Sequence, residues 1–395
     1  MSKSICLCFQ VHLPYRLRTY RFFEIGNKHN YFDDYNNRIY TRRIAEKSYL
    51  PMNTILMELI KKHGQRFKVA FSFSGDALDL MEQYAPEAIE SFAALVGTGN
   101  VEVLATPYAH SLASLWSDTE LKRQVNKHKR KIKELFGVTP KTFHNTELIY
   151  NDEIGAKIAD LGYNLVITEG AKHILGWKSP NYLYANAINP KQKVMLRNFN
   201  LSDDVVFRFN NPPFTADEYA ERIARTSPDE EIVSLFMEYE TFGEYYDANS
   251  GIFDFVKALP DAVFSKGDIV FATPTEAAKK TQPIGVINVP NTLSWSDEER
   301  DINLWLGNDL QEDAFKALGK LESKMKRVKD EDIRYDWEVL QIADYLYYMN
   351  TKWLSNSALH KNVNQYPSPY DAYINYMNIL TDFNVRIDES LKKKH

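Results

Sequence analysis

The order of secondary structure along the chain constrains the fold more than any other feature of the sequence. Up to about residue 285, short apolar runs typical of buried strands alternate with amphipathic helical patterns. This strand, loop and helix unit recurs about seven times. Neighbouring parallel strands need a crossover connection, which is usually a helix. The sequence therefore predicts an α/β fold with a parallel sheet.

The rhythm changes after about residue 285. No convincing strand follows residues 287–289, and three long helical patterns appear instead, at residues 296–329, 331–354 and 370–392. A loop at residues 355–369 sets the last pattern apart. We predict two domains: residues 1–285 form the α/β domain, and residues 286–395 form a helical domain packed on its rim.

Charge and cysteine content exclude several classes of partner. The chain of 395 residues has 48 basic and 53 acidic side chains spread along it, so no basic stripe predicts binding to nucleic acid or to an anionic membrane. Its N-terminus has no signal-peptide pattern, and Cys6 and Cys8 lie on one face of the first strand, where they would pack rather than form a disulfide. We expect a cytoplasmic protein. Aromatic residues make up 13% of the chain, which suits a sugar ligand but also a large core.

Polar clusters follow several predicted strands or stand at domain junctions. In an α/β barrel the carboxyl ends of all strands meet at one mouth, so clusters remote in sequence would line one pocket. Paired carboxylates in such a pocket indicate glycoside chemistry, in which one acid protonates the leaving oxygen while the other attacks or activates water. The clusters are His12 with Pro14, Glu102 through His110, Glu147, Glu238 with Glu240, and Glu276.

Six sequence blocks carry a resemblance to a known family. They are FQVHLPYR, GNVEVLATPYAHSL, FHNTELIYND, LFMEYETFGE, TPTEAAKK and LSWSDEERDINLWLGNDLQ, in this order. Together they resemble the ordered sequence regions of glycoside hydrolase family 57, in its α-amylase-type branch, from the first strand to about Gln311. The helical tail fits the family less specifically.

The resemblance implies a distorted (β/α)7 barrel followed by a helical bundle. It further implies a retaining enzyme that acts on α-1,4-glucans without a metal or another cofactor. Glu147 matches the family's nucleophile, and His12 matches a histidine that binds sugar hydroxyls beside it. Further residues would bind substrate or support the groups that do, and a purely structural role is as consistent with the sequence for each. These residues are Glu240, His110, Glu102, Trp295 and Tyr239.

One departure from the family pattern leaves alternatives open. The family's acid/base is normally an aspartate, and Glu238 stands at that position with a side chain longer by one C–C bond, about 1.5 Å. The alternatives to a hydrolase are an α-glucan-binding protein with little turnover and a 4-α-glucanotransferase. A metal-dependent enzyme on a similar barrel is a further alternative, but the histidines form no close pair after a strand in the sequence. They are His12, His110, His128, His144 and His173.

Overall fold

The computed structural model describes residues 3–352 and 364–392. Its strands are β1 (Lys3–Val11), β2 (Val69–Phe73), β3 (Val101–Leu104), β4 (Thr142–His144), β5 (Leu165–Glu169), β6 (Leu183–Asn186), β7 (Lys193–Arg197), β8 (Ile232–Glu238), β9 (Ile269–Phe271) and β10 (Val286–Ile287). Its longer helices are α1 (Asp34–Ile44), α2 (Leu50–His63), α3 (Gly75–Tyr84), α4 (Pro86–Gly97), α5 (Asp118–Phe136), α6 (Asp152–Asp160), α8 (Phe199–Phe207), α9 (Ala216–Ala224), α10 (Ile252–Ser265), α13 (Asp309–Met325), α14 (Glu331–Val339) and α17 (Pro369–Lys392). Shorter helices are α7 (Lys172–Leu175), α11 (Pro274–Lys280), α12 (Asn303–Leu306) and α15 (Asp344–Tyr347).

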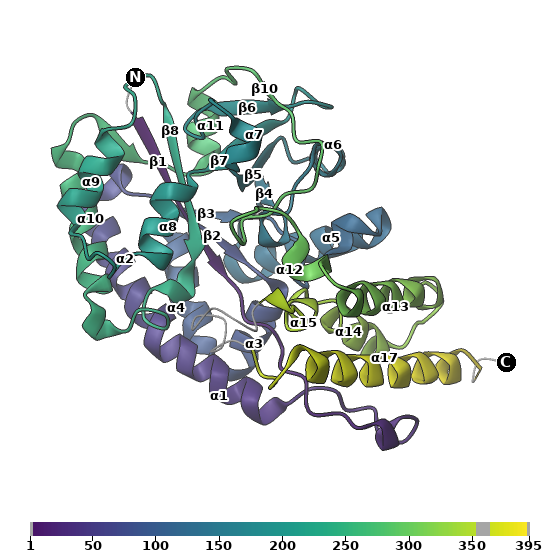
Figure 1. Cartoon of the computed structure of the whole chain (residues 1–395). Coiled ribbons are helices and arrows are strands. Elements are labelled where there is room, and N and C mark those ends of the chain that lie inside the picture. Colours follow the sequence, from purple (N-terminus) through teal and green to yellow (C-terminus); the bar gives the residue numbers. More distant parts are fainter. Residues whose placement is uncertain (1–2, 353–363, 393–395) are drawn as a thin grey trace.

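Seven strands of the described chain close into a parallel ring. β1 pairs with β8 on one side and β2 on the other, β2 pairs with β3, and β4, β5 and β7 continue the order. Two narrow seams complete the ring: Ala105 bridges to Phe143 next to β3 and β4, and Arg197 pairs with Ser234 between β7 and β8. β6 runs antiparallel to β7 and carries β10. The result is a distorted barrel around which the helices lie (Figure 1).

Alternate residues of the strands face the barrel interior and the surrounding helices. Cys6 and Cys8 of β1 lie inside with Phe236 of β8, whereas Leu7 and Phe9 belong to the larger core beneath the helices. The two cysteines are buried and not joined, which confirms that they act as small apolar residues. The interior becomes polar toward the carboxyl ends of the strands.

The helical region after the barrel is shorter and more broken than predicted. α12, α13, α14, α15 and α17 lie together at the lower right of Figure 1, and α13 packs against both α15 and α17. Residues 296–302 are not helical, and β10 still pairs with the barrel sheet, so the helices begin only at Asn303. Most of the predicted loop at residues 355–369 lies outside the described residues. The division of the chain into domains at residue 285 stays a prediction.

Four details of the sequence pattern differ from the structure. The pattern predicts a weak strand at residues 204–209, which lie largely in helix α8, and a long loop at residues 17–40, which ends at Asp34, where α1 begins. It also predicts that Pro51 breaks or kinks a helix at residues 41–62, but Pro51 occupies the first turn of α2, after a π-helical turn, Ala45–Tyr49. Asp76 is the N-cap that the sequence predicts for α3, but the N-cap is Ser74, whose Oγ accepts from Ala77 N at 3.1 Å.

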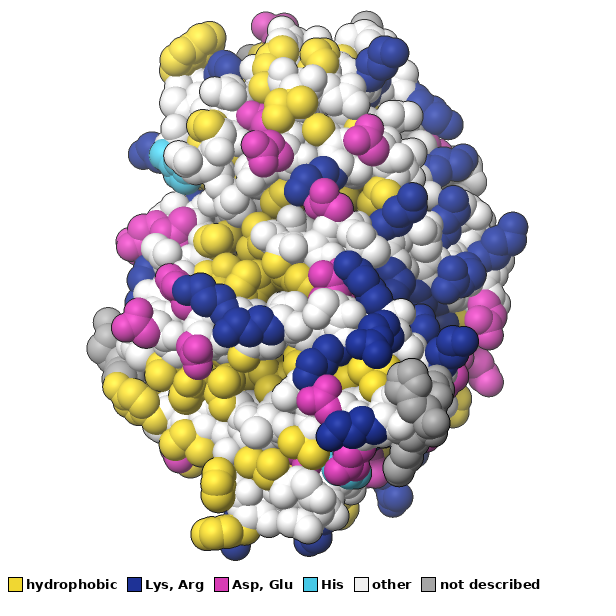
Figure 2. Space-filling view, turned by 90° about the vertical axis from the view of Figure 1, so that its right-hand side faces the viewer, with side chains coloured by type: hydrophobic (Ala, Val, Ile, Leu, Met, Phe, Trp, Pro, Cys, Tyr) yellow, Lys and Arg dark blue, Asp and Glu magenta, His cyan; other side chains and the backbone are white. Residues whose placement is uncertain are grey.

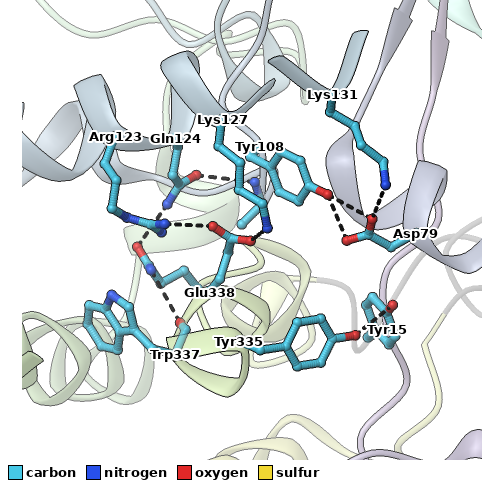
Figure 3. A network of polar contacts seen from close by, with 12 residues as sticks. Tyr15, Asp79, Tyr108, Arg123, Gln124, Lys127, Lys131, Tyr335, Trp337 and Glu338 are labelled. Atoms are coloured by element: carbon cyan, nitrogen blue, oxygen red, sulfur yellow. Dashed lines mark hydrogen bonds and ion pairs between the residues drawn. The ribbon is translucent and has the colours of Figure 1, made fainter. Parts of the chain in front are cut away.

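Charged side chains join the helical region to the barrel helix α5. The carboxylate of Glu338, from α14, is buried and receives Arg123 Nη1 at 2.8 Å and Lys127 Nζ from α5 (Figure 3). Tyr335 donates its hydroxyl to Tyr15 at 2.8 Å on the same face of α14. Removing one partner of a buried ion pair strongly destabilises a protein. These contacts therefore hold α14 against the barrel, and with it the position of the following helix, α15.

The surface around this junction is mixed in character. Figure 2 shows many Lys and Arg side chains on this face, interspersed with Asp and Glu and with apolar side chains. Among the described residues, no helix is both long enough and apolar enough to cross a membrane. The predicted cytoplasmic location stays a prediction.

Candidate active site

The carboxyl ends of β1, β4 and β8 meet at one mouth of the barrel. His12 directly follows β1, Glu147 lies in the turn after β4, and Glu238 is the last residue of β8. The loop after β3 adds His110. The structure therefore brings together four of the side chains that the sequence singled out, although they come from four separate segments of the chain.

Glu147 is held by two N–H donors, one on each carboxyl oxygen. His110 Nε2 donates to Oε1 at 2.6 Å, and the indole Nε1 of Trp295 donates to Oε2 at 2.7 Å. The Glu147 side chain keeps 15% of its surface exposed, so one face remains open to solvent. Its backbone φ of 54° is left-handed, as is that of Leu148 at 53°. Two charge-assisted bonds and this unusual backbone fix a carboxylate that is still accessible.

The two histidines form a stacked pair that leads to a further acid. The rings of His12 and His110 lie 3.8 Å apart between centroids. His12 Nε2 contacts Asp344 Oδ2 at 2.9 Å, and its Nδ1 contacts Ser74 Oγ at 2.8 Å. Burial lowers the pKa of His110 below its ordinary value, and the neighbouring His12 ring acts in the same direction. A neutral His110 is then a hydrogen-bond donor to Glu147 without adding a charge.

His12, His110 and Asp344 lie close enough together to raise the question of a metal site, because potential ligand atoms of these three lie within 4.8 Å of one another. The two imidazole rings are stacked and their planes are inclined by 22°, so the lone pairs of the two rings lie in separate, nearly parallel planes. Binding one ion through both rings at about 2 Å, as imidazole nitrogens do at zinc, would require the rings to turn. Both Nε2 atoms are also engaged with carboxylates. Each histidine is thus held by a carboxylate, and the two rings are joined by stacking.

Glu238 has a different environment from Glu147. Its carboxyl is partly buried at the end of β8, and burial raises its pKa to about 8, with the charges of Glu147 and Glu240 acting in the same direction. A side-chain hydrogen bond from Tyr245 opposes this rise without cancelling it. The charge of Glu147 also reaches Tyr347, whose pKa burial raises. The raised pKa favours the protonated form of Glu238 at neutral pH, at the same barrel mouth as the Glu147 carboxylate, which accepts two N–H bonds.

Glu240 supports the turn that follows β8. Its side chain is buried, and Oε1 accepts from the hydroxyl of Tyr49 and from the backbone N of His12 at 3.3 Å. Burial raises its pKa to about 7. Tyr49 belongs to the π-helical turn Ala45–Tyr49, and Gly243 allows this turn to approach, since a Cβ there would lie 2.0 Å from Lys47 O. Such π turns often occur at functional sites.

Two residues singled out from the sequence lie elsewhere. Tyr239 is fully buried among Phe9, Phe71 and Phe92 on the helix side of the barrel wall, where its hydroxyl donates to Asn53 Oδ1 at 2.6 Å. It is a core residue. Glu238, which precedes it, ends β8, whereas Tyr239 itself begins the 3-10 turn Tyr239–Thr241.

Glu102 lies in β3 near the amino-terminal end of the strand, away from the barrel mouth. Its carboxylate accepts from Thr142 Oγ1 at 2.7 Å and from the backbone N of Thr275 at 2.9 Å, in the first turn of α11. Glu276 of the same helix pairs with Lys68 at 2.5 Å and completes the helix N-cap with Thr273. These acids attach α11 to the barrel and do not reach the mouth.

A comparison of the sequence with family models gives one match across most of the chain. The model described as Glycosyl hydrolase family 57 covers residues 6–290. The chain belongs to glycosyl hydrolase family 57. The resemblance inferred from the sequence blocks is therefore confirmed.

Two relatives of this family 57 protein carry the name alpha-amylase. A protein of Methanocaldococcus jannaschii that carries the provisional name alpha-amylase is 38% identical over 406 residues, covering 98% of this chain and 85% of that protein. Alpha-amylase 1 of Dictyoglomus thermophilum is 24% identical over 312 residues, covering 77% of this chain and 43% of that protein.

Solved structures of family 57 share the fold at low sequence identity. The branching enzyme of Thermococcus kodakaraensis has a TM-score of 0.74 at 13% identity, covering 98% of this chain and 90% of that chain. The 4-alpha-glucanotransferase of Thermococcus litoralis has a TM-score of 0.62 at 16% identity, covering 96% of this chain and 59% of that chain. Together with the ring of parallel strands, this similarity confirms the predicted (β/α)7 barrel with a helical C-terminal region.

Sequence reasoning missed several residues of this family 57 site. Asp344 comes from α15, far from any strand, and Tyr49 and Tyr245 reach the carboxyls from a helical turn and a loop. Local patterns do not report such contacts. The block LFMEYETFGE, which continues directly from β8 and ends at Glu244, one residue before Tyr245, was the nearest signal for these three.

Proposed function

We propose that the protein is a retaining α-glucan hydrolase of the α-amylase type, with Glu147 as nucleophile and Glu238 as acid/base. The observation that carries this proposal is the contrast between two carboxyls at one barrel mouth. Glu147 accepts two N–H hydrogen bonds, and the pKa of Glu238 is raised to about 8. Glycoside cleavage with retention needs one ionised and one protonated carboxyl of this kind.

The chemistry would proceed in two displacements. The Glu147 carboxylate attacks the anomeric carbon while Glu238 gives its proton to the departing glycosidic oxygen, which breaks the C–O bond and leaves a glycosyl ester on Glu147. Water then attacks the same carbon, Glu238 takes the water's proton, and Glu147 leaves as carboxylate. His12 lies beside the nucleophile through the His110 stack, in a place where it contacts sugar hydroxyls in this proposal.

The longer Glu238 side chain is compatible with this role in its surroundings. Its hydrogen bond with Tyr245 and its partial burial limit the conformations of the carboxyl. The charge of Glu147 is among the causes that raise the pKa of Glu238, which supports placing the two carboxyls at one site. The substitution of glutamate for aspartate is therefore expected to retain turnover.

Purified protein incubated with maltoheptaose and with soluble starch tests the proposal. We expect new reducing ends from the wild type, none from Glu147→Gln, and a rate lower by about 10²–10⁴-fold from Glu238→Gln. The matched control is Glu153→Gln, which changes an exposed glutamate on α6 and should match the wild type. Proton NMR of the first products should show the α-anomer, and initial release of the β-anomer would refute retention.

The same assay decides between the alternatives. Binding of maltoheptaose without any product would identify a glucan-binding protein with an inactive site. Accumulation of longer oligosaccharides from maltoheptaose in place of net hydrolysis would identify a 4-α-glucanotransferase, an activity that the name of the Thermococcus litoralis protein assigns to that protein. A transferase would keep Glu147 as nucleophile and Glu238 as acid/base, whereas binding without product would refute both catalytic roles.

A further inference from the structure

The loop that carries Trp295 is attached to Glu147 at two points. The indole of Trp295 donates to Glu147 Oε2 at 2.7 Å, and the backbone N of Trp295 donates to Glu147 O at 3.3 Å. The position of the nucleophile therefore depends on the position of this loop, residues 293–301. The loop belongs neither to a strand nor to a helix.

Arg300 is itself a residue of this loop, and its contacts stabilise the loop conformation. One guanidinium nitrogen, Nη1, donates to the backbone O of Trp295, and the other, Nη2, contacts Asp203 Oδ2 at 2.7 Å. The backbone O of Arg300 accepts from Ser294 N at 3.1 Å, which closes the loop on itself. Arg300 and Asp297 both have left-handed backbones, with φ of 53° and 65°. Non-glycine residues keep such conformations only where surrounding contacts enforce them.

Arg300 is connected in turn to a buried ion cluster at the barrel mouth. Asp203, in α8, also contacts Arg197 Nη2 at 2.5 Å through its other oxygen, and Arg197 contacts Glu169 Oε2 at 2.9 Å. Arg197 lies at the end of β7, is almost fully buried, and donates Nε to Phe236 O at 2.7 Å. Its guanidinium lies 5.4 Å from the centre of the Trp295 ring. Two cations and two anions thus balance one another around this tryptophan.

We propose that Arg300 is a positioning residue for the nucleophile: it fixes Trp295, and through the indole N–H it fixes the Glu147 carboxylate. This inference rests on the proposed function for the role of Glu147. Arg300 touches neither Glu147 nor the open face of the site directly. Its effect passes through one backbone carbonyl and one indole.

A lysine cannot replace Arg300 in this role. The planar guanidinium offers donors in two directions at fixed spacing, and here one serves Trp295 O while the other serves Asp203. An ammonium group on a flexible stem retains the ion pair with Asp203 but does not hold the carbonyl in the same geometry. Arg300→Lys therefore separates charge pairing from loop positioning, and Arg300→Gln removes both.

Steady-state kinetics on maltoheptaose provides the first test. We expect kcat of Arg300→Lys and of Arg300→Gln to fall by about 10–100-fold, with KM within about twofold of the wild type, since a displacement near 1 Å has about this effect on rate. Combining Arg300→Lys with Trp295→Phe should give no loss beyond that of Trp295→Phe alone. The control Arg225→Gln removes an exposed arginine with one salt bridge on the surface and should leave kcat unchanged.

The second test needs no turnover. The 15N-labelled indole of Trp295, assigned by its loss in Trp295→Phe, should exchange its proton slowly in the wild type and at least about tenfold faster in Arg300→Gln and Arg300→Lys. Exchange and kcat that both stay at wild-type values in the two Arg300 variants would overturn the inference, as would a fall in kcat with the indole still protected. A wild type that protects the indole but cleaves no glucan refutes the proposed function while the effect of Arg300 on Trp295 is still measured. If Arg300→Gln does not fold, Arg300→Lys decides.

Discussion

Replacing Glu238 by glutamine should stabilise the protein at neutral pH while it removes activity. The reason is the difference between the pKa of this carboxyl in the folded protein, about 8, and its ordinary value of 4.5. Below pH 4.5 the group is protonated in both the folded and the unfolded states. As the pH rises from 4.5 to 8, the unfolded chain ionises while the folded protein keeps the proton, so the wild type loses stability. Glutamine carries no ionisable proton and escapes this loss.

The magnitude follows from the same two values. Each pH unit between them lowers the free energy of unfolding by about 1.4 kcal/mol, so the stability of Glu238→Gln relative to the wild type should rise by up to about 3 kcal/mol between pH 4.5 and pH 7. Above pH 8 the difference should level off. If the glutamine amide packs better or worse than the carboxyl, the free energy of unfolding changes by the same amount at every pH, so the slope of the difference against pH is unaffected.

Urea denaturation of both proteins at several fixed pH values measures this difference, with Glu153→Gln as the control that should show no slope against the wild type. Because the chain is larger than most two-state domains, the pH dependence of the difference is compared, and not the absolute free energy. In a Glu147→Gln background the rise should be smaller, since the Glu147 charge is one cause of the raised pKa. A difference that stays constant from pH 4.5 to pH 8 would refute the assignment of Glu238 as a protonated acid.

Three further predictions follow from the same contacts. The kcat/KM of the wild type on maltoheptaose should fall about tenfold per pH unit above pH 8 as Glu238 loses its proton, and Glu240→Gln should move this limb to lower pH; a flat profile to pH 10 would contradict this. Glu238→Asp withdraws the carboxyl from Tyr245 by about 1.5 Å and should lower kcat on the order of 100-fold, so an equal or higher kcat would disprove the fit of the longer side chain. Tyr239→Phe loses the bond to Asn53 and should lower the free energy of unfolding in urea by about 1 kcal/mol with kcat unchanged, whereas a fall in kcat would place Tyr239 in the site after all.

The barrel could be predicted because each of its strands is encoded by a short, local stretch of sequence. The short apolar run at residues 232–237, bounded by polar residues, predicts a strand, and β8 is found at Ile232–Glu238. The wrongly predicted elements also result from reading the sequence locally. Val205 and Val206 favour a strand by propensity, yet they form the buried face of α8, whose N-cap Asn198 accepts from Leu201 N at 3.0 Å. There the capping and packing of a helix outweigh the preference of two β-branched side chains.

Much of the candidate site could be predicted because it follows strands, whereas Trp295, in a loop, was singled out through the resemblance of its sequence block. His12, Glu147 and Glu238 were singled out because each follows or ends a strand of the barrel. Asp344 was not, because its contact with His12 depends on how α15 docks on the barrel, and that docking is fixed by distant ion pairs such as Glu338 with Arg123. The direction of the Tyr239 side chain could not be predicted either, because this residue stands between Glu238 and Glu240 in the sequence but is buried in the core.

The backbone conformations show why this site needs more than the barrel. Five non-glycine residues of the described chain have positive φ, and they are Glu147 itself and residues of the segments around it: His110, Glu147, Leu148, Asp297 and Arg300. Each conformation is unfavourable by about 1–3 kcal/mol and persists only if neighbouring contacts enforce it. Those contacts come largely from beyond the last barrel helix, with Ala343 N donating to His110 O at 3.1 Å and Trp295 N donating to Glu147 O at 3.3 Å. The strands bring the carboxyls to one mouth, and the loop and helix that follow them in sequence hold Glu147 in place.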